Sequence, residues 1–186
     1  KGRDIAGCRY EQLLPFEANN IKKIREITPD ADPFKVIIGD FVTTEDGTGI
    51  VHIAPSFGSD DFRVAKQNGI GSLTLVDRQG KFVDAVNDEV FPLQNRYVKE
   101  DYYTAEEKQA EYEYQKMILS EKGVIPNLKS FMSVDDLIVL KLKLENKLFK
   151  TEKYEHSYPH CWRTDKPVIY YPLDSWFIKT TAVKNR

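Results

Sequence analysis

The chain has 186 residues, of which 41% are hydrophobic and 30% are charged, and its formal net charge at pH 7 is −2. This length and composition suit one domain with a sizeable core, and the weakly acidic balance argues against a protein that grips a nucleic-acid duplex through clustered Lys and Arg. No apolar run reaches the roughly 18 to 20 residues of a membrane span, and two cysteines are too few for a disulfide scaffold, so we expect a cytoplasmic protein with no membrane partner.

Residues 1–91 are predicted to be mainly β. Short segments rich in β-branched and aromatic residues alternate there with turn signals, including Asn19-Asn20, Pro29-Asp30 and Gln79-Gly80. Several short strands separated by turns favour a small barrel.

A β-hairpin is predicted around Asp46-Gly47. This dipeptide accepts the positive φ angles of a tight turn, and apolar or β-branched residues flank it at 36–42 and 50–54. In the second strand His52 shares a face with Ile50 and Ala54, because alternate residues of a strand point the same way. Pro55 ends the strand, since proline cannot donate to the ladder.

A helix is predicted directly after this strand. Ser59 is the expected N-cap, Asp60 and Asp61 fall in the first turn, and Gly69 fits the position just past the helix end. Acids in a first turn commonly complement the helix dipole, and a strand histidine is commonly a satisfied core residue. The Gly- and Pro-containing connection between His52 and the two acids is nevertheless the kind of loop where binding groups gather.

Two helices are predicted within residues 101–150. Thr104-Ala105-Glu106-Glu107 is a capping box that opens a helix to about Lys122, with Gly123 at its end. Its expected core stripe contains Ala110, Tyr114, Met117 and Ile118. Ser133 opens the second helix, where Leu137, Leu140, Leu144 and Leu148 have core spacing. From about residue 151 the chain is predicted to return to strands.

A cluster near the end of the chain invites a metal interpretation. It contains Tyr154, His156, His160, Cys161 and Trp162. Closed zinc sites normally take four ligands at spacings such as C-x₂-C, and Thr164 stands where the second cysteine would fall. We therefore expect no metal and interpret the cluster as a packed polar corner.

The run from Asp40 to Pro55, continued by Gly58 and Asp60-Asp61, resembles the signature of the editing domain inserted in class I isoleucyl-, valyl- and leucyl-tRNA synthetases. A second run, Ser157 to Arg163 with 167–170 and 175–178, resembles the returning arm of the isoleucyl members. Residues 7–16 are similar to an early part of the same insertion, so the resemblance spans nearly the whole chain.

The resemblance implies an α+β fold over residues 1–186, as a single editing-domain fragment. It would be a small β-barrel-like domain with peripheral helices and β-strand arms leading back to a parent catalytic domain. On this view 1–91 and about 151–186 are mainly β, and 101–150 is a helical insertion.

The implied reaction is hydrolysis of valine wrongly esterified to tRNA(Ile). One methylene is worth only about 1 to 3 kcal/mol of discrimination, a limit for which these enzymes are the standard example. Asp61 is expected to hold the α-ammonium of the misattached amino acid, and His52 to line the pocket. Its wall is expected from Thr48, Gly49, Ser56, Phe57, Gly58 and Asp60. Only motif spacing favours Asp61 over Asp60 as the inward acid, because adjacent helical residues diverge by about 100°.

The expected partners are the acceptor end of tRNA(Ile) carrying valine and the catalytic domain of the parent chain. No cofactor is expected for this domain, since ATP and Mg²⁺ belong to aminoacylation by the parent. The family's Thr-rich pocket strand is absent from this chain, so we expect the fragment to be weak or inactive alone. Two alternatives stay open: a non-catalytic module that binds the tRNA acceptor end, and a structural spacer with a degenerate metal hinge.

Overall fold

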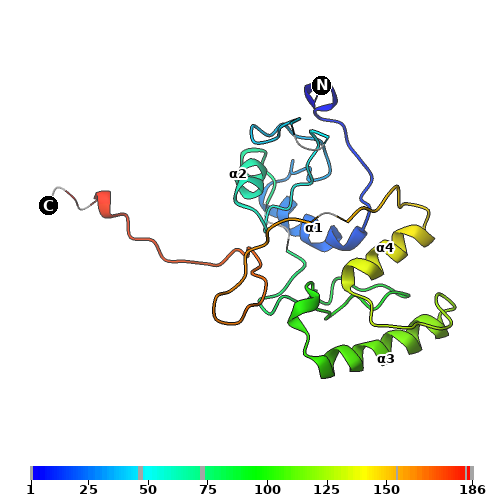
Figure 1. The fold of residues 1–186 in the computed structure, drawn as a ribbon. Helices are drawn as coiled ribbons and strands as arrows, with labels where there is room; N and C mark the ends of the chain where they lie inside the picture. Colours follow the sequence, from blue (N-terminus) through cyan, green and yellow to red (C-terminus); the bar gives the residue numbers. More distant parts are fainter. Residues whose placement is uncertain (1, 46–47, 72–73, 154, 183, 185–186) are drawn as a thin grey trace.

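The computed structural model describes residues 2–45, 48–71, 74–153, 155–182 and 184. Its longer elements are helices: α1 (Ala18–Ile27), α2 (Ser59–Gln67), α3 (Ala105–Glu121) and α4 (Val134–Leu144). Short 3₁₀ turns are η1 (Gly2–Ile5), η2 (Pro15–Glu17), η3 (Glu100–Tyr102) and η4 (Thr180–Ala182). In Figure 1, α1 and α2 lie in one part of the molecule and α3 and α4 in another. No helix of the described ranges is long and apolar enough to cross a membrane.

The predicted α+β fold with a small β-barrel is wrong. Over the described residues, the backbone forms isolated antiparallel bridges but no strand; they join Arg9 to Lys35, Val76 to Phe82, Lys81 to Tyr97 and His160 to Pro167. The expectation that 1–91 and 151–186 are mainly β fails with it.

The hairpin strands at 36–42 and 50–54 are absent as well, and their turn at Asp46-Gly47 lies outside the described residues. Ile50 and Val51 are 68% and 51% exposed. β-branched residues stabilise a strand through cross-strand neighbours and a covered face. Among the described residues no β-bridge pairs 36–42 with 50–54, and Ile50 and Val51 have no covered face. The β pattern in the sequence is therefore not sufficient to form a sheet here.

Helix α1 is the element that the sequence pattern missed, because Asn19-Asn20 was interpreted as a turn. The two asparagines instead form its first turn, directly after η2. Asn20 Nδ2 donates to Glu17 Oε2 at 2.7 Å, and Ile21 is buried one residue later. A local side-chain bond and an apolar face thus override the turn preference of asparagine.

Helix α2 matches its prediction closely at the C-terminus and is shifted by one residue at the start. Gly69 has φ +67°, which confirms it as the residue past the helix end. Gly58, not Ser59, is the N-cap, and no side chain caps the helix there. Val64 and Ala65 are the buried residues of α2.

Helices α3 and α4 begin at the predicted caps. Thr104 and Ser133 each form a reciprocal capping box, with Glu107 and Asp136 respectively, and Gly123 has φ +71° after α3. The two helices pack with residues 82–93 around a core of Val86, Phe91, Leu93, Leu119, Leu128, Val134 and Leu137. We call this unit, residues 82–148, the helical lobe.

The stripe predicted for α3 points the wrong way. Tyr114 and Met117 are exposed, whereas Gln115 and Leu119 are buried. Gln115 fits the core because its side chain bonds both the N–H and the C=O of Met132, each at 2.9 Å. A satisfied amide therefore occupies a buried position that the predicted stripe did not include.

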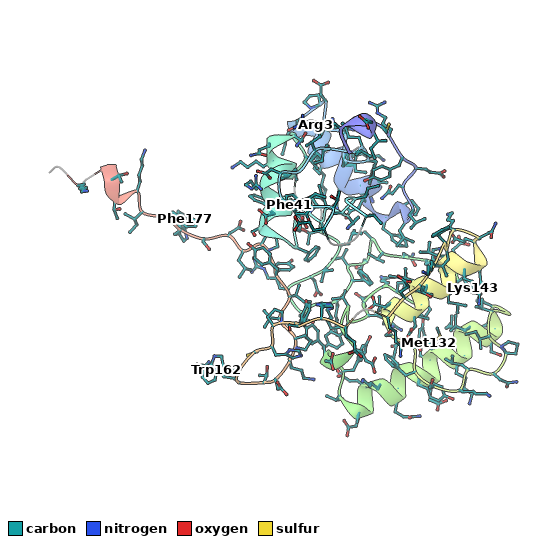
Figure 2. All side chains as sticks on the ribbon, turned by 45° about the horizontal axis from the view of Figure 1, so that its top comes forward. Arg3, Phe41, Met132, Lys143, Trp162 and Phe177 are labelled. Carbon is teal, nitrogen blue, oxygen red and sulfur yellow. The ribbon has the colours of Figure 1, made fainter. Side chains whose placement is uncertain are left out.

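The chain after the helical lobe returns to the middle of the molecule and then leaves it. Tyr102 Oη donates to the carbonyl of Pro167 at 2.7 Å, and Tyr171 Oη donates to the carbonyl of Val76 at 3.1 Å. Beyond these contacts the chain extends away from the body, and Phe177 is 91% exposed (Figures 1 and 2).

Candidate functional site

A tight turn connects the segment carrying His52 to helix α2. Phe57 N–H donates to the Ala54 carbonyl at 2.9 Å, with Pro55 in the second position of the turn, where its fixed φ is favourable. Pro55 and Ser56 are buried. The sequence Ala-Pro-Ser-Phe therefore forms a fixed turn that directs the chain into the N-terminus of α2.

Asp61 lies against this turn. Its Oδ2 accepts the backbone N–H of Ala54 at 3.2 Å, and the residue is half-buried. A Cβ atom built on Gly58 would lie 2.7 Å from that same oxygen, so the carboxylate rests directly against the glycine. A carboxylate has acceptor positions for about four hydrogen bonds. In the described part of the chain one hydrogen bond thus holds the Asp61 carboxylate, which keeps acceptor capacity for a cationic ligand.

Asp60 faces elsewhere. Its Oδ1 lies 3.2 Å from Arg63 Nη2, and the same nitrogen lies 2.8 Å from Asp40 Oδ1. The Arg63 guanidinium lowers the pKa of Asp40, chiefly through their hydrogen bond. Asp60 thus belongs to an exposed ion-pair network, which the spacing of Asp60 and Arg63 on one helix face could have indicated.

The side chains upstream of the turn are not gathered around Asp61. His52 is exposed, and among the described residues no hydrogen bond or ion pair joins it to Asp61. Thr48 is also exposed and bonds locally, accepting from the N–H of Ile50 at 3.3 Å. Gly49 has φ +76°, a left-handed conformation that glycine adopts without strain.

Ser56 and Phe57 connect the turn to distant parts of the chain. Ser56 is 1% exposed, and its Oγ lies 2.7 Å from Thr74 Oγ1. The Phe57 ring packs edge to face on Tyr171, with centroids 6.3 Å apart. These two predicted wall residues therefore fix the turn to the rest of the structure.

The predicted packed polar corner is wrong, because His156 and His160 are exposed; residues 159–168 form a tight loop instead, and Tyr154 lies outside the described residues. Cys161 N–H donates to the Lys166 carbonyl, and Asp165 N–H donates to the Cys161 carbonyl, both at 2.8 Å. The hydrogen bond with Thr164 is the main cause that lowers the pKa of the Cys161 thiol, followed by backbone hydrogen bonds at Arg163 and Thr164. Within the described part of the chain, no three His, Cys, Asp or Glu side chains are arranged to hold a metal ion. Trp162, at the tip of the loop, is 85% exposed (Figure 2).

Sequence reasoning missed a surface hollow elsewhere. It has a volume of about 500 Å³ and is lined in part by Arg9, Tyr10 and Arg25, none of which belongs to the predicted site. A second hollow, of about 280 Å³, lies beside α3 and is lined in part by Arg96 and Glu111.

The chain aligns over its whole length with isoleucine–tRNA ligases. The identity is 52% with the protein from Cytophaga hutchinsonii, 44% with that from Bacteroides fragilis and 35% with that from Thermoplasma acidophilum. The aligned regions are 15%, 16% and 14% of those proteins, so the chain spans about one seventh of the length of these relatives.

No family model matches the chain. Each of these pairwise alignments nevertheless covers 100% of the chain. The chain is therefore homologous, over its whole length, to one segment of isoleucine–tRNA ligases.

Proposed function

We propose that this chain is the editing segment of an isoleucyl-tRNA synthetase, and that within the longer protein it hydrolyses valine from valyl-tRNA(Ile). The observation that carries the proposal is the position of Asp61. Its carboxylate is fixed by the Ala54 N–H against a glycine, in a segment homologous to isoleucine–tRNA ligases. The proposed partners are the acceptor end of the tRNA and the remainder of the synthetase.

Asp61 would hold the α-ammonium of the esterified valine. A charge-assisted hydrogen bond between an ammonium and a carboxylate is stronger than a neutral one, and a helix start holds the acid rigidly. The bond to Ala54 uses one acceptor position, which leaves the rest of the carboxylate for the ligand. Asp61 therefore binds and orients the ester; it does not attack it.

The hydrolytic step needs a water molecule beside the ester carbonyl. The ammonium contact fixes the carbonyl relative to the turn, so the attack gains from proximity and orientation. His52 would approach the substrate from the segment before the turn and screen its side chain or contact the terminal ribose. No cofactor is proposed for this step; ATP and Mg²⁺ would serve aminoacylation by the rest of the synthetase.

The test is a pair of neighbouring substitutions in the full-length protein. Asp61→Ala should abolish deacylation of valyl-tRNA(Ile) and leave isoleucine activation intact. Asp60→Ala is the matched control, because it removes the same charge one residue away from an exposed pair with Arg63. Normal deacylation by Asp61→Ala, or equal losses in both variants, would show that the ammonium contact is assigned wrongly.

The 186-residue chain alone is expected to be weak or inactive in the same assay. In the described residues no hydrogen bond or ion pair joins His52 to Asp61, and His52 is exposed. This arrangement favours a second candidate function, a module that binds the tRNA acceptor end without hydrolysis. Full-rate deacylation by the 186-residue chain would contradict the expectation that it is weak or inactive alone. Tight tRNA binding with no hydrolysis, even in the full-length protein, would establish the second.

A further inference from the structure

The larger hollow, of about 500 Å³, lies beside α1 in the N-terminal part of the chain. Its volume is in the range of roughly 300 to 1,000 Å³ that small-molecule sites occupy. Two arginines, two aromatic rings and two carboxylates contribute to its lining. The hollow contains none of the residues assigned above to editing.

The backbone around the hollow is held by a short antiparallel pairing of residues 7–10 with 34–36. Tyr10 N–H donates to the Phe34 carbonyl at 3.1 Å, and Val36 N–H donates to the Cys8 carbonyl at 2.8 Å. The Tyr10 and Phe34 rings pack edge to face, with centroids 6.2 Å apart. Tyr10 is still 53% exposed, so part of its ring is available to a ligand.

Each arginine of the hollow is fixed by a single nitrogen. Arg9 Nε donates to Asp32 Oδ2 at 2.8 Å, and Arg25 Nε donates to the Ala31 carbonyl at 3.2 Å. In the described chain the Nη atoms of both side chains donate to no protein group. The two guanidiniums are therefore oriented by their Nε atoms while their terminal donors stay available.

We propose that this hollow binds a nucleotide of single-stranded RNA, with its phosphate at Arg9 and Arg25 and its base stacked on Tyr10. The planar donor fork of arginine matches the oxygens of a phosphate, and bases of unpaired RNA stack on aromatic side chains. Asp30 and Asp32 balance the two cations, so long-range attraction is weak. Selection then depends on phosphate and ring together, which favours a nucleotide over a simple anion.

This site lies outside the editing residues, and the inference rests on the proposed function only for the source of the RNA. The acceptor end of a tRNA is single-stranded, and its nucleotides would be the ones available. The hollow would provide a second contact that positions the RNA, separate from the contact to the esterified amino acid.

Binding can be measured by calorimetric titration of the whole 186-residue chain with AMP, adenosine, inorganic phosphate and a short oligoadenylate. AMP should bind about tenfold more tightly than adenosine or phosphate, because it uses both halves of the site. The oligoadenylate should bind more tightly than AMP. Arg9→Ala and Tyr10→Ala should each weaken AMP binding by about tenfold, and Tyr10→Phe, which keeps the ring, should restore it.

Lys22→Ala is the matched control, because it removes one positive charge from an exposed position of α1 that does not line the hollow. It should leave AMP affinity unchanged, and circular dichroism checks that every variant keeps its helices. Equal losses in Lys22→Ala and Arg9→Ala, or equal affinity for AMP and phosphate, would overturn the site. Equal affinity for AMP and oligoadenylate would overturn RNA as the ligand and assign a free mononucleotide. These titrations involve no deacylation, so this inference and the role of Asp61 fail independently.

Discussion

Among the described helices, α2, α3 and α4 carry an acidic residue at the third position, and the two regions of the molecule use it differently. In the helical lobe, Glu107 and Asp136 return to their own N-cap N–H groups and complete capping boxes. In α2, Asp61 reaches past the N-cap Gly58 to the N–H of Ala54. A first-turn acid that does not cap its own helix, such as Asp61, keeps its carboxylate for another role.

The same two regions differ in how they are stabilised. The helical lobe encloses an apolar core that includes Leu119 and Leu137, both 0% exposed. Helix α2 buries two small side chains, Val64 and Ala65. Because local stability follows buried apolar contacts, we expect the helical lobe to open less often than the turn and helix that carry Asp61.

The largest expected effect is a cavity in the helical lobe. Leu137→Ala should lower the free energy of unfolding by about 2 to 5 kcal/mol, because the side chain is fully buried. Leu144→Ala, on the same helix but 57% exposed, should change it by less than about 0.5 kcal/mol. Urea denaturation measures both. Equal losses would mean that α4 does not pack as described.

A smaller effect is expected from acid. Lys141 Nζ lies 2.7 Å from Asp88 Oδ2. Burial raises the pKa of Asp88, but the bonds from Lys141, Phe91 and Val90 outweigh it, and the pKa lies below its usual value. The carboxylate therefore stabilises the fold above the unfolded-state pKa of about 3.9, and this contribution is lost as pH falls through the lower folded-state pKa.

Asp88→Asn tests that assignment. The amide can still accept backbone N–H groups but carries no charge for Lys141. The variant should be less stable than the native chain at pH 7. The difference should begin to shrink below the unfolded-state pKa of about 3.9 and disappear once pH falls below the lower folded-state pKa, where Asp88 of the native fold is also neutral. Denaturation midpoints across this pH range measure it. A difference that is constant with pH would rule out the ion pair as the cause.

The capping box of α3 should contribute less to the free energy of unfolding than the core residue Leu137. Thr104→Ala removes the acceptor of the Glu107 N–H and should cost about 1 kcal/mol. Amide hydrogen exchange in the first turn of α3 should accelerate while exchange in α2 stays unchanged. Faster exchange in both helices would show that the two regions open together, and the comparison between them would fail.

The smallest change in stability is expected at Gly58, the N-cap of α2 that lies against Asp61. Gly58→Ser gives α2 a preferred N-cap residue, so the free energy of unfolding should stay within about 1 kcal/mol of the native value. The added Cβ would meet Asp61 Oδ2 at 2.7 Å, and the carboxylate must move. In the full-length protein, deacylation should fall with no loss of stability. Undiminished deacylation would mean that the resting position of Asp61 is unimportant.

Local signals in the sequence predicted α2, α3 and α4 but missed α1. The capping residues Thr104 and Ser133, and the closing glycines Gly69 and Gly123, are confirmed because each depends on bonds or dihedral angles within a few residues. The barrel was wrong because strand formation depends on distant partners, which the alternation around His52 does not specify. The α3 stripe was wrong because Tyr114 and Met117 are exposed and a polar residue, Gln115, is buried instead. The Gln115 amide bonds to the backbone of Met132, 17 residues further along the chain, which no helical pattern specifies.

In the candidate site too, features set by nearby residues could be predicted, and features that need distant parts of the chain could not. Motif spacing selected Asp61 over Asp60, and the structure places Asp61 on the turn and Asp60 on Arg63. The hollow with Arg9 and Arg25 could not be predicted, because its two arginines come from separate segments. Only the pairing of residues 7–10 with 34–36 brings them to one place.

The hydrogen bond between Tyr171 and Val76 joins residues 95 positions apart, and the whole helical lobe lies between them. Closing such a loop costs entropy that rises only with the logarithm of its length, about 0.6 kcal/mol for each doubling. Insertions or deletions inside the lobe therefore change the closure cost little. A change in the length of the lobe therefore need not break the contact between Tyr171 and Phe57. The lobe can vary in size while the position of the turn next to Asp61 is retained.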